Sequence, residues 1–234
     1  MDIRILASGS TGNGYVVSDG VSSLLIECGI SIKAIKQKLN FDLSGIVGCL
    51  ISHQHLDHCK SARDVMKAGI DIYANKETLS SIEAVREYPH RWNQVNHGQA
   101  IEIETFVINP FELQHDVANT GYFIYSKVTK EKLVFITDSY YCKYRFAGLN
   151  FIMVECNYSP DILQKNIENG SVNEAMKNRL LESHFSLPNV KKFLKANDLS
   201  KVEEIYLIHL SNANSDEARF KKEIQELTGK VVYT

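Results

Sequence analysis

The segment His53-Gln54-His55-Leu56-Asp57-His58 places four metal-binding side chains within six residues. It follows the run from Gly45 to Ser52, which is short, apolar and rich in β-branched residues and therefore indicates a buried strand. The chain has only eight histidines, and three of them lie in this segment. We therefore interpret it as a metal-binding loop at the end of a strand rather than as a chance group of exposed histidines.

The local geometry of this segment favours two adjacent metals. In an extended chain alternate side chains point to the same side, so His53 and His55 face one way. The turn into an expected helix from Lys60 to Ala68 directs Asp57 and His58 elsewhere. Imidazole nitrogen and carboxylate oxygen are good ligands for Zn²⁺, the metal we favour, and such sites also accept Mn²⁺ or Fe²⁺.

Length and composition are those of one globular domain. A chain of 234 residues can bury a large core, so we expect a single domain over residues 1–234. Hydrophobic residues make up 44% and charged residues 23%, and no apolar stretch approaches the ~18 to 20 residues of a membrane span. No signal peptide is evident at the N-terminus, so we expect a soluble, cytoplasmic protein without membrane association. The sequence gives no sign of an obligate protein partner.

Cysteine usage argues against a disulfide-stabilised protein, and net charge argues against a protein that attracts nucleic acid by its overall charge. The five cysteines form no C-x-x-C pair and their number is odd, which indicates reduced thiols rather than a disulfide framework. Cys59 adjoins the histidine segment, but a small thiol there is more often a packing residue than a ligand. The net charge of −2 offers no global attraction for nucleic acid, so an anionic substrate has to be captured by a local field.

The pattern of apolar residues predicts a mixture of strands and helices. Strand-like segments are Ile3 to Ala7, Tyr15 to Ser18, Ser23 to Ile26, Gly45 to Ile51, Asp71 to Ala74, Glu102 to Asn109, Gly121 to Ser126, Lys132 to Thr137, Phe151 to Glu155 and Glu204 to Ile208. Helix-like segments are Ser31 to Leu39, Lys60 to Ala68, Lys76 to Arg86, Asn173 to Glu182, Leu187 to Ala196 and Asp216 to Thr228. Asp19-Gly20 is a hairpin signal.

Strands in runs, separated by single helices and without regular βαβ alternation, favour two mixed sheets packed face to face with helices outside. The polar stretch from Asp161 to Gly170 is the best candidate for a mobile loop, although an ordinary surface connection is equally compatible with it.

Three further donors stand just beyond apolar strand-like segments: His115, Asp138 and His209. His115 is separated from its strand by an expected turn at Pro110. A lone histidine after a strand is more often solvated than a ligand. However, ligands of sheet-based folds cluster at strand ends, so we expect these donors to join the histidine segment. His90 and His97 lie in less apolar stretches and are left out.

In the order of these metal donors along the sequence, the chain resembles the metallo-β-lactamase superfamily, whose members carry H-x-H-x-D-H, then His, Asp and His. The matching positions are His53, His55, Asp57, His58, His115, Asp138 and His209. The resemblance covers essentially the full length, including a segment from Leu24 to Gly29 in which Glu27 replaces the usual Asp. It implies an α+β fold, a four-layer αββα sandwich of two mixed β-sheets.

Shorter motifs resemble the WalJ/YycJ-type exonuclease branch of that superfamily, with a layout similar to ribonuclease Z. They are Leu6 to Asn13, Ile136 to Ser139, Glu155 to Tyr158, Ser183 to Ser186 and Ile208 to Asn212. Two departures stand out. Ser183-His184-Phe185-Ser186 replaces the usual Gly-His-Leu-Ser, and no insert matches the arm of ribonuclease Z or the extra domain of β-CASP nucleases.

The resemblance also implies roles for these residues. It assigns His53, His55 and His115 to one metal, Asp57, His58 and His209 to the other, and Asp138 to both. Such a site is net positive and attracts a phosphodiester, which a metal-bridging hydroxide would hydrolyse. Asp57 would orient the water or accept its proton, and His184 is the candidate proton donor to the leaving alkoxide, although a solvated histidine in a turn between helices is the alternative.

Candidates for substrate contact are weaker. The glycine- and hydroxyl-rich loop from Ser8 to Gly14 could cradle a phosphate with its N–H groups, yet it lacks the lysine of a P-loop. The candidates are Ser8, Ser10 and Asn13 in that loop, together with Asn157, Asn212 and Asn214. Tyr140, Tyr141 and Tyr144 with Lys143 and Arg145 could stack bases and hold phosphates, although a half-exposed amphipathic segment is the commoner use of such a stretch.

Three functions compete on these residues. The leading hypothesis is a dinuclear metal-dependent phosphodiesterase or exonuclease acting on DNA or RNA. The alternative is a small-molecule hydrolase for a lactone, thioester or lactam, and the third is a metal-binding module without catalysis. Class B1 β-lactamases carry Cys at the position of Asp138, and glyoxalase-type thioesterases do not need His184, so both features favour the nuclease. Polarity, native metal and oligomeric state stay open.

Overall fold

The computed structural model describes the backbone of residues 1–234 and every side chain except those of Ala84 and Glu174. The described chain divides into two compact units. Unit 1 comprises Met1–Glu112 and Val117–Glu131, and unit 2 comprises Leu113–Asp116 and Lys132–Thr234. The expected single domain therefore stays a prediction. The helices of the described residues are all too short or too polar to span a lipid bilayer.

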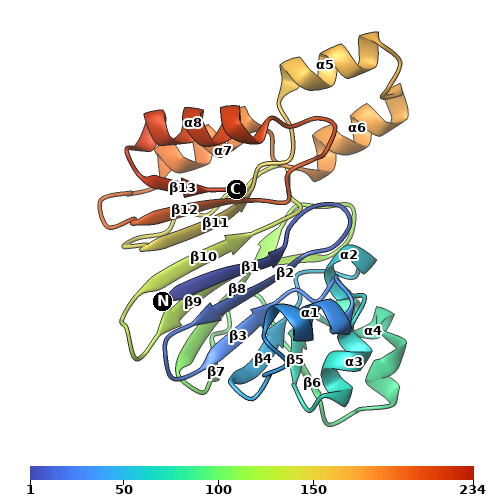
Figure 1. Cartoon of the computed structure of the whole chain (residues 1–234), viewed down its shortest axis with the longest axis vertical. Helices are drawn as coiled ribbons and strands as arrows, with labels where there is room; N and C mark the ends of the chain where they lie inside the picture. The colour runs from blue at the N-terminus through green and yellow to red at the C-terminus, as the bar shows by residue number, and fades with distance from the viewer. The chain divides into compact units, whose positions relative to one another are not determined.

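Unit 1 contains a six-stranded sheet with the order β1-β2-β3-β4-β5-β6 (Figure 1). The strands are β1 (Asp2–Ala7), β2 (Gly14–Ser18), β3 (Ser23–Ile26), β4 (Ile46–Leu50), β5 (Ile72–Ala74) and β6 (Trp92–Gln94). The pairs β1–β2 and β2–β3 are antiparallel, and the other three pairs are parallel. The predicted hairpin turn is confirmed, because the Asp19 carboxylate accepts hydrogen bonds from the N–H groups of Val21 and Ser22.

The helices of unit 1 pack their apolar side chains against this sheet. They are α1 (Ile32–Lys38), α2 (Leu56–Cys59), α3 (Ala62–Lys67) and α4 (Lys76–Ser81), followed by the 3-10 helix η1 (Glu83–Arg86). Ser31 and Asn75 cap α1 and α4 by accepting the N–H groups of Ala34 and Thr78, as expected for these residue types. The buried cluster contains Leu25 and Cys49 from the sheet together with residues of α1, α3 and α4.

The predicted strand from Glu102 to Asn109 is wrong in its extent. It is two antiparallel strands, β7 (Ile101–Ile103) and β8 (Phe106–Leu113), joined by a turn in which Glu104 has a φ of 49°. The predicted turn at Pro110 is also wrong, because Pro110 lies inside β8. Its pairing with β7 ends at Ile108, so the missing N–H of the proline costs that ladder no hydrogen bond. Strand β9 (Asn119–Ser126) completes the strands of unit 1.

Unit 2 contains parallel strands in the order β13-β12-β11-β10. They are β10 (Lys132–Ile136), β11 (Phe151–Glu155), β12 (Glu204–Ile208) and β13 (Val231–Tyr233). All of β11 is buried, which explains its continuous apolar run. Helices α7 (Leu187–Ala196) and α8 (Glu217–Thr228) bury apolar side chains, including Phe193 and Phe220. The register pairs Glu155 with Ile208, so the carboxyl ends of these strands share one edge.

The predicted mobile loop from Asp161 to Gly170 is wrong. The segment forms helix α5 (Pro160–Glu168), with the proline in its first turn, and is followed by α6 (Glu174–Ser183). Leu163 is buried against Tyr158, with Ile167 one turn later packed on the same cluster. Two apolar residues at helical spacing are enough to dock this short helix, although its polar composition resembles a loop.

Two mixed β-sheets with helices confirm the expected α+β architecture. The expected helix from Lys76 to Arg86 is divided into α4 and η1, and the very short elements β6, β13 and α2 were not expected. Segments of three or four residues are too short to display a hydrophobic period, so the sequence pattern does not reveal them.

Candidate functional site

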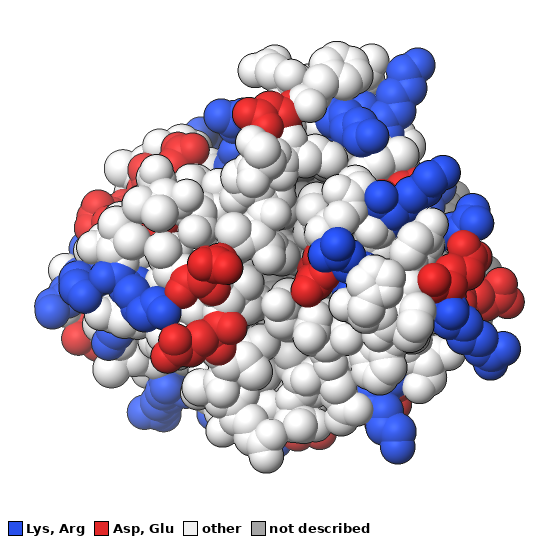
Figure 2. All heavy atoms as spheres, turned by 90° about the horizontal axis from the view of Figure 1, so that it is seen from below, with Lys and Arg blue, Asp and Glu red and all other residues white. Residues whose placement is uncertain are grey.

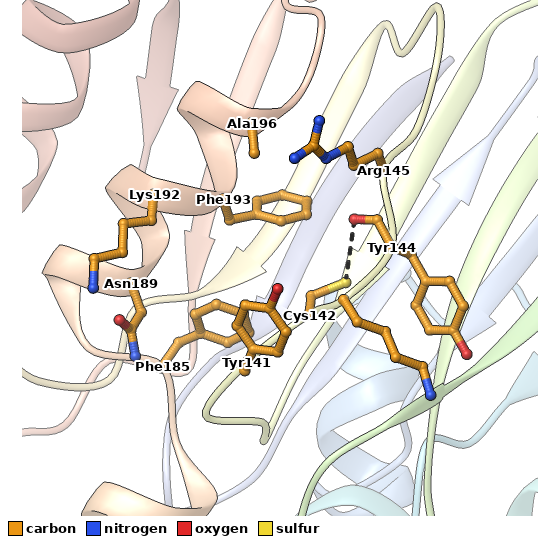
Figure 3. Close-up of a pocket in the computed structure, with 10 residues that line it drawn as sticks. Tyr141, Cys142, Tyr144, Arg145, Phe185, Asn189, Lys192, Phe193 and Ala196 are labelled. Atoms are coloured by element: carbon orange, nitrogen blue, oxygen red, sulfur yellow. Dashed lines mark hydrogen bonds between the residues drawn. The ribbon is translucent and has the colours of Figure 1, made fainter.

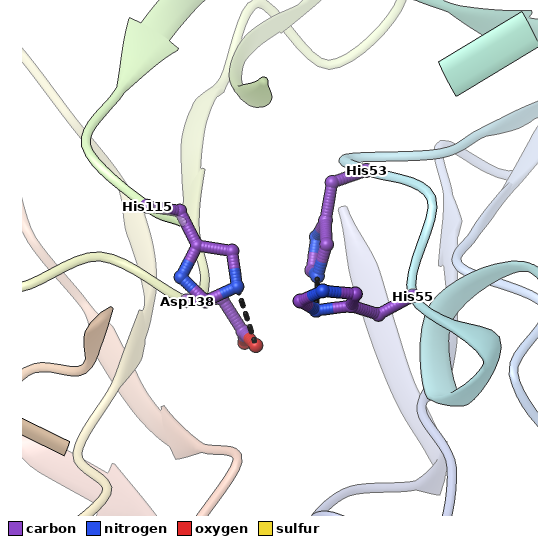
Figure 4. A group of neighbouring side chains, drawn as sticks. All are labelled: His53, His55, His115 and Asp138. Atoms are coloured by element: carbon purple, nitrogen blue, oxygen red, sulfur yellow. Dashed lines mark hydrogen bonds and ion pairs between the residues drawn. The ribbon is translucent and has the colours of Figure 1, made fainter. Parts of the chain in front are cut away.

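Unit 1 contributes the four donors of the histidine segment as two pairs. His53 and His55 follow β4, and their Nε2 and Nδ1 atoms lie 3.0 Å apart (Figure 4). Asp57 and His58 belong to α2, and their Oδ2 and Nε2 atoms lie 3.4 Å apart. Zinc bonds of ~2.0 to 2.2 Å separate two ligand atoms on one metal by about 3 Å, so each pair has the spacing of ligands that share an ion.

A buried carboxylate supports His58 from behind. Glu27 follows β3 with a φ of 62°, and its Oε1 accepts a hydrogen bond of 3.1 Å from the N–H of Ser52. Its Oε2 lies 3.5 Å from Nδ1 of His58, on the side of the ring opposite Nε2. Such a carboxylate orients the imidazole and leaves Nε2 for a metal. In the sequence Glu27 stood out only as a departure from a motif, although an acid directly after a buried strand needs a partner.

The loop between β1 and β2 is tied to α2 by Asn13. This buried residue donates its backbone N–H and its Nδ2 to the carbonyl of Asp57, at 2.8 and 3.1 Å, and Nδ2 lies 3.4 Å from Nε2 of His58. Asn13 therefore positions the metal-binding segment. Ser8 and Ser10 are exposed in the same loop, and their contact with substrate stays a prediction.

Gly29 lies between β3 and α1 and permits this connection to pack closely on α2, because a Cβ added to it would lie 1.6 Å from the carbonyl oxygen of Asp57. We expect Gly29→Ala to destabilise the metal-free protein by about 3 kcal/mol or more, since the clashing atoms belong to the backbone. Urea denaturation in the presence of a chelator measures this. Gly45→Ala is the control, because its Cβ would meet only Ser23 Oγ at 3.9 Å. Equal midpoints for the two variants would contradict the packing argument.

Unit 2 contributes a second group of donors. Ligand atoms of Asp138, Glu155, His184 and His209 all lie within 4.8 Å of one another. Asp138 follows β10 and His209 follows β12, and both have a positive φ, 48° and 52°. This left-handed turn is uncommon for non-glycine residues and takes each side chain out of the strand direction.

The two oxygens of the Asp138 carboxylate face different histidines. Oδ2 lies 3.8 Å from Nε2 of His115, a contact drawn as a dashed line in Figure 4, and Oδ1 lies 3.6 Å from Nε2 of His209. His115 Nδ1 donates to the carbonyl of Ser183 at 3.1 Å, which leaves Nε2 as its metal-binding atom. Burial lowers the pKa of His115, despite the nearby Asp138, and thereby favours the neutral imidazole that binds metals.

Glu155 organises this group and was not assigned a role from the sequence. It is fully buried at the end of β11. Its Oε1 accepts Nδ1 of His184 at 2.6 Å, and its Oε2 accepts the N–H groups of Ser139 and Phe185 at 3.1 Å each. Burial opposes the charge on Glu155, but His184 outweighs it and lowers the pKa of the carboxyl. A glutamate closing a fully apolar strand was the signal, because such an acid requires partners.

His184 is the first residue after α6, and only 17% of its side chain is exposed. Its ring stacks on that of His209, with centroids 5.6 Å apart. Burial alone disfavours the imidazolium form, but the negative charge of Glu155 outweighs it and raises the pKa of His184. Phe185, which replaces the usual leucine, is fully buried and packs on Phe193, so it anchors the His184 backbone in the core.

The remaining candidates take different positions. Asn157 donates its Nδ2 to the carbonyl of His209 at 3.0 Å and thus holds that residue, whereas Asn212 is exposed. Asn214 is buried and accepts Nδ2 of Asn166. Cys59 donates to the carbonyl of Gln54, and burial raises the pKa of its thiol to about 12, which fits a packing residue.

Charged side chains of both signs are interspersed on the face seen in Figure 2, with no broad basic patch there. This agrees with the net charge of −2. Attraction of an anion therefore depends on local cations.

The family described as the Beta-lactamase superfamily domain has a sequence model that matches residues 23–210. The chain belongs to this superfamily. Among curated proteins, Exodeoxyribonuclease YycJ of Bacillus anthracis is 27% identical over 232 residues, covering 92% of this chain and 84% of that protein. Exodeoxyribonuclease WalJ of Streptococcus pneumoniae is 28% identical over 225 residues, covering 90% and 82%.

Solved structures confirm the fold expected of this superfamily. The metallo-beta-lactamase fold protein YhfI from Bacillus subtilis matches with a TM-score of 0.71 and 16% identity, covering 99% of this chain and 94% of that one. Human tRNase Z, short form, matches with a TM-score of 0.67 and 16% identity, covering 100% and 96%. Superfamily members with this fold are hydrolases, and the histidine and carboxylate donors of both units fit the divalent metal ions that the fold implies.

Proposed function

We propose that this protein is a dinuclear metal-dependent phosphodiesterase that acts as an exonuclease on DNA. One observation carries the proposal: the His184–Glu155 pair, with its hydrogen bond of 2.6 Å, lies within the donor group of Asp138 and His209. A phosphodiester expels a poor alkoxide leaving group, so its hydrolysis needs a proton donor next to the metals. The exodeoxyribonuclease names of the two curated relatives favour DNA over RNA.

We propose the ligand assignment that the superfamily order implies. One metal would be held by His53, His55 and His115, the other by Asp57, His58 and His209, with Asp138 bridging them. The donor pairs of unit 1 and the divided carboxylate of Asp138 support it. When bound, such metals lower the pKa of a water to roughly 7 and offset charge on the phosphoryl oxygens. Nitrogen and oxygen donors without a thiolate fit Zn²⁺, Mn²⁺ or Fe²⁺, of which we propose Zn²⁺.

The protein side chains then carry the proton transfers. Asp57, whose carboxyl is 26% exposed, orients the attacking water and accepts its proton. As the water oxygen bonds to phosphorus, the bond from phosphorus to the leaving sugar oxygen breaks. His184 delivers a proton from Nε2 to that oxygen and becomes neutral, while Glu155 orients the ring through Nδ1 and stabilises its protonated form before the transfer.

The competing function is hydrolysis of a lactone, thioester or lactam by the same donors. A thiolate leaves without protonation, so a thioesterase gains little from a buried carboxylate dedicated to His184. A digestion panel decides between the two functions. End-labelled single and double strands, with and without a 5′ phosphate, are incubated with the protein and Zn²⁺ or Mn²⁺, beside a His55→Ala control. If the metal-loaded protein leaves every strand intact, the nuclease proposal is wrong.

We expect two metal ions per chain and loss of all hydrolytic activity on their removal. Protein purified without chelators should contain close to two equivalents of metal by elemental analysis. Chelation should abolish cleavage, and readdition should restore it while raising Tm, because a ligand that binds only the folded state stabilises it. Less than one metal per chain under these conditions would instead favour a non-catalytic module. The predicted cytoplasmic location has no bearing on these tests and stays a prediction.

A further inference from the structure

A pocket in unit 2 lies next to the Asp138 turn. It has a volume of about 270 Å³ and is formed by the irregular loop after β10 and by α7, which line it from two sides in Figure 3. Its lining residues are Tyr141, Cys142, Lys143, Tyr144, Arg145, Phe185, Asn189, Lys192, Phe193 and Ala196. The volume falls just below the range of ~300 to 1,000 Å³ typical of small-molecule sites, so it suits one nucleotide rather than a duplex.

The pocket wall is anchored to the proposed metal centre. Ser139, the neighbour of Asp138, donates its N–H to Glu155 and its Oγ to the carbonyl of Tyr141 at 2.8 Å. Three residues span at most about 11 Å of chain, so Tyr141 cannot lie far from Asp138. A DNA strand whose end is bound at the metals would therefore pass close to this pocket.

The loop is fixed to α7 at both ends, so the pocket exists before any ligand binds. Asn189 donates its Nδ2 to the carbonyl of Tyr140 at 3.1 Å. The N–H of Phe146 donates to Asn197 Oδ1, just after α7, at 2.7 Å. A preformed pocket loses less conformational entropy on binding than a loop that must order first.

The chemistry of the lining matches a nucleotide. Tyr141 is 56% exposed, whereas the two phenylalanines that line the same pocket, Phe185 and Phe193, are core residues at 0% and 6%. The exposed ring is therefore not explained by packing. Three of the lining residues are cations and none is acidic among the described residues, in a chain whose net charge is −2. Arg145 and Lys192 make no ion pair or side-chain hydrogen bond within the described part of the chain, which leaves both for an anion.

We propose that this pocket binds one nucleotide of a single-stranded DNA end, with the base stacked on Tyr141 and the two flanking backbone phosphates held by Arg145 and Lys192, one by each. Aromatic stacking together with cations that follow the backbone is the usual way in which proteins hold single strands without reading sequence. The inference rests on the proposed nuclease function, but the pocket can be tested without cleavage.

The first test measures binding to chelated protein, which cannot hydrolyse the probe. A fluorescent oligothymidine of about ten nucleotides, within the site sizes of single-strand binders, is titrated by anisotropy. Tyr141→Ala should weaken binding roughly 5- to 150-fold, the equivalent of ~1 to 3 kcal/mol for one stacked base. Tyr141→Phe is the matched control and should bind like the wild type, because it retains the ring. Equal affinity of Tyr141→Ala and wild type would overturn the proposal.

A series of probes with one abasic site at each position separates stacking from damage to the fold. With wild-type protein, loss of the base at one position should reproduce the effect of Tyr141→Ala. With Tyr141→Ala, that same abasic probe should lose no further affinity, because the two changes remove one interaction. Additive losses at every position would show that Tyr141 does not contact a base.

The phosphate contact is tested through the dependence of affinity on salt. Arg145→Gln and Lys192→Gln should each reduce the slope of log K against log salt by about 0.7, the value for one phosphate on a single strand. Lys195→Gln is the control, since this exposed lysine is also on α7 but does not line the pocket. Slopes equal to that of wild type in both pocket variants would overturn the phosphate assignment.

Parallel cleavage assays distinguish failure of the pocket from failure of the proposed function. If the enzyme digests DNA, Tyr141→Ala should raise KM with little change in kcat, because the pocket holds a nucleotide away from the bond that breaks. Cleavage with no effect of Tyr141→Ala on binding or KM would reject the pocket and retain the nuclease. Tyr141-dependent binding without any cleavage would retain the pocket and reject the nuclease.

Discussion

Asp138→Asn is expected to lower the rate of DNA cleavage by about three orders of magnitude, the equivalent of ~4 kcal/mol in the barrier. In the proposed centre this carboxylate is the bridging ligand, and an amide offers one neutral oxygen in place of two anionic ones. The φ of 48° at this position is tolerated by asparagine, so the variant should fold normally. A lower rate in this variant would therefore reflect the changed metal ligand and not a loss of folding stability.

The same variant should lose one metal in preference to the other. Oδ1 of Asp138 accepts a hydrogen bond of 2.7 Å from Thr137 Oγ1, so the oxygen of the new amide should keep that position, which faces His209. The amide nitrogen then takes the place of Oδ2, on the side that faces His115. An amide nitrogen cannot coordinate a metal, so the ligand on that side is lost. Elemental analysis should find about one metal per chain instead of two.

Asp198→Asn serves as the control for this prediction. Asp198 is exposed and accepts the N–H of Ser200 in a surface turn, so the same chemical change there should leave metal content and cleavage within about twofold. Two bound metals and a near-normal rate in Asp138→Asn would remove the basis for a bridging role.

His184→Ala is expected to lower kcat on DNA by about 10²- to 10⁴-fold, the usual contribution of a positioned proton donor. The loss should be much smaller on a p-nitrophenyl phosphodiester, whose phenolate leaves without a proton. This difference between substrates separates proton donation from a merely structural role. His90→Ala is the control, because this exposed histidine lies outside the donor groups. An equal loss on both substrates would exclude His184 as the proton donor.

Glu155→Gln provides a second readout on the same pair through the pH profile. The charge of Glu155 raises the pKa of His184 against the opposing effect of burial. A proton donor must be protonated, so the rate that depends on it falls as the pH rises through this pKa. Removal of the charge lowers the pKa, and the fall should therefore occur at lower pH in the variant than in the wild type. A profile that does not move would show that Glu155 is not linked to His184 in catalysis.

The spacing of donors and strand ends made most of the candidate site predictable. His53, His55, Asp57 and His58 form the two expected pairs in unit 1 because strand alternation and a turn act over only a few residues. Asp138 and His209 follow apolar segments of the sequence. The end of such a segment predicts the end of a strand, which is where the structure places both residues. Local pattern is sufficient for such positions.

Other features escaped the sequence for identifiable reasons. Helix α5 has only a narrow apolar stripe, and its docking on Tyr158 rather than its composition makes it a helix. Pro110 can lie within β8 because the pairing of β8 with β7 ends at Ile108. This depends on the length of the neighbouring strand, which the residues around the proline do not reveal. Glu27 and Glu155 gained roles only when burial gave each of them specific partners.

The amino-acid order alone indicated which side chains are candidate metal donors, because the spacing of histidines and aspartates beyond apolar segments is local information. Tertiary structure decided how they are oriented. The parallel register of β10, β11 and β12 places Asp138, Glu155 and His209 at one edge, although they are distant in sequence. Only this juxtaposition gives Glu155 the imidazole of His184 as a partner, because a buried carboxylate is stable only where the fold supplies its donors.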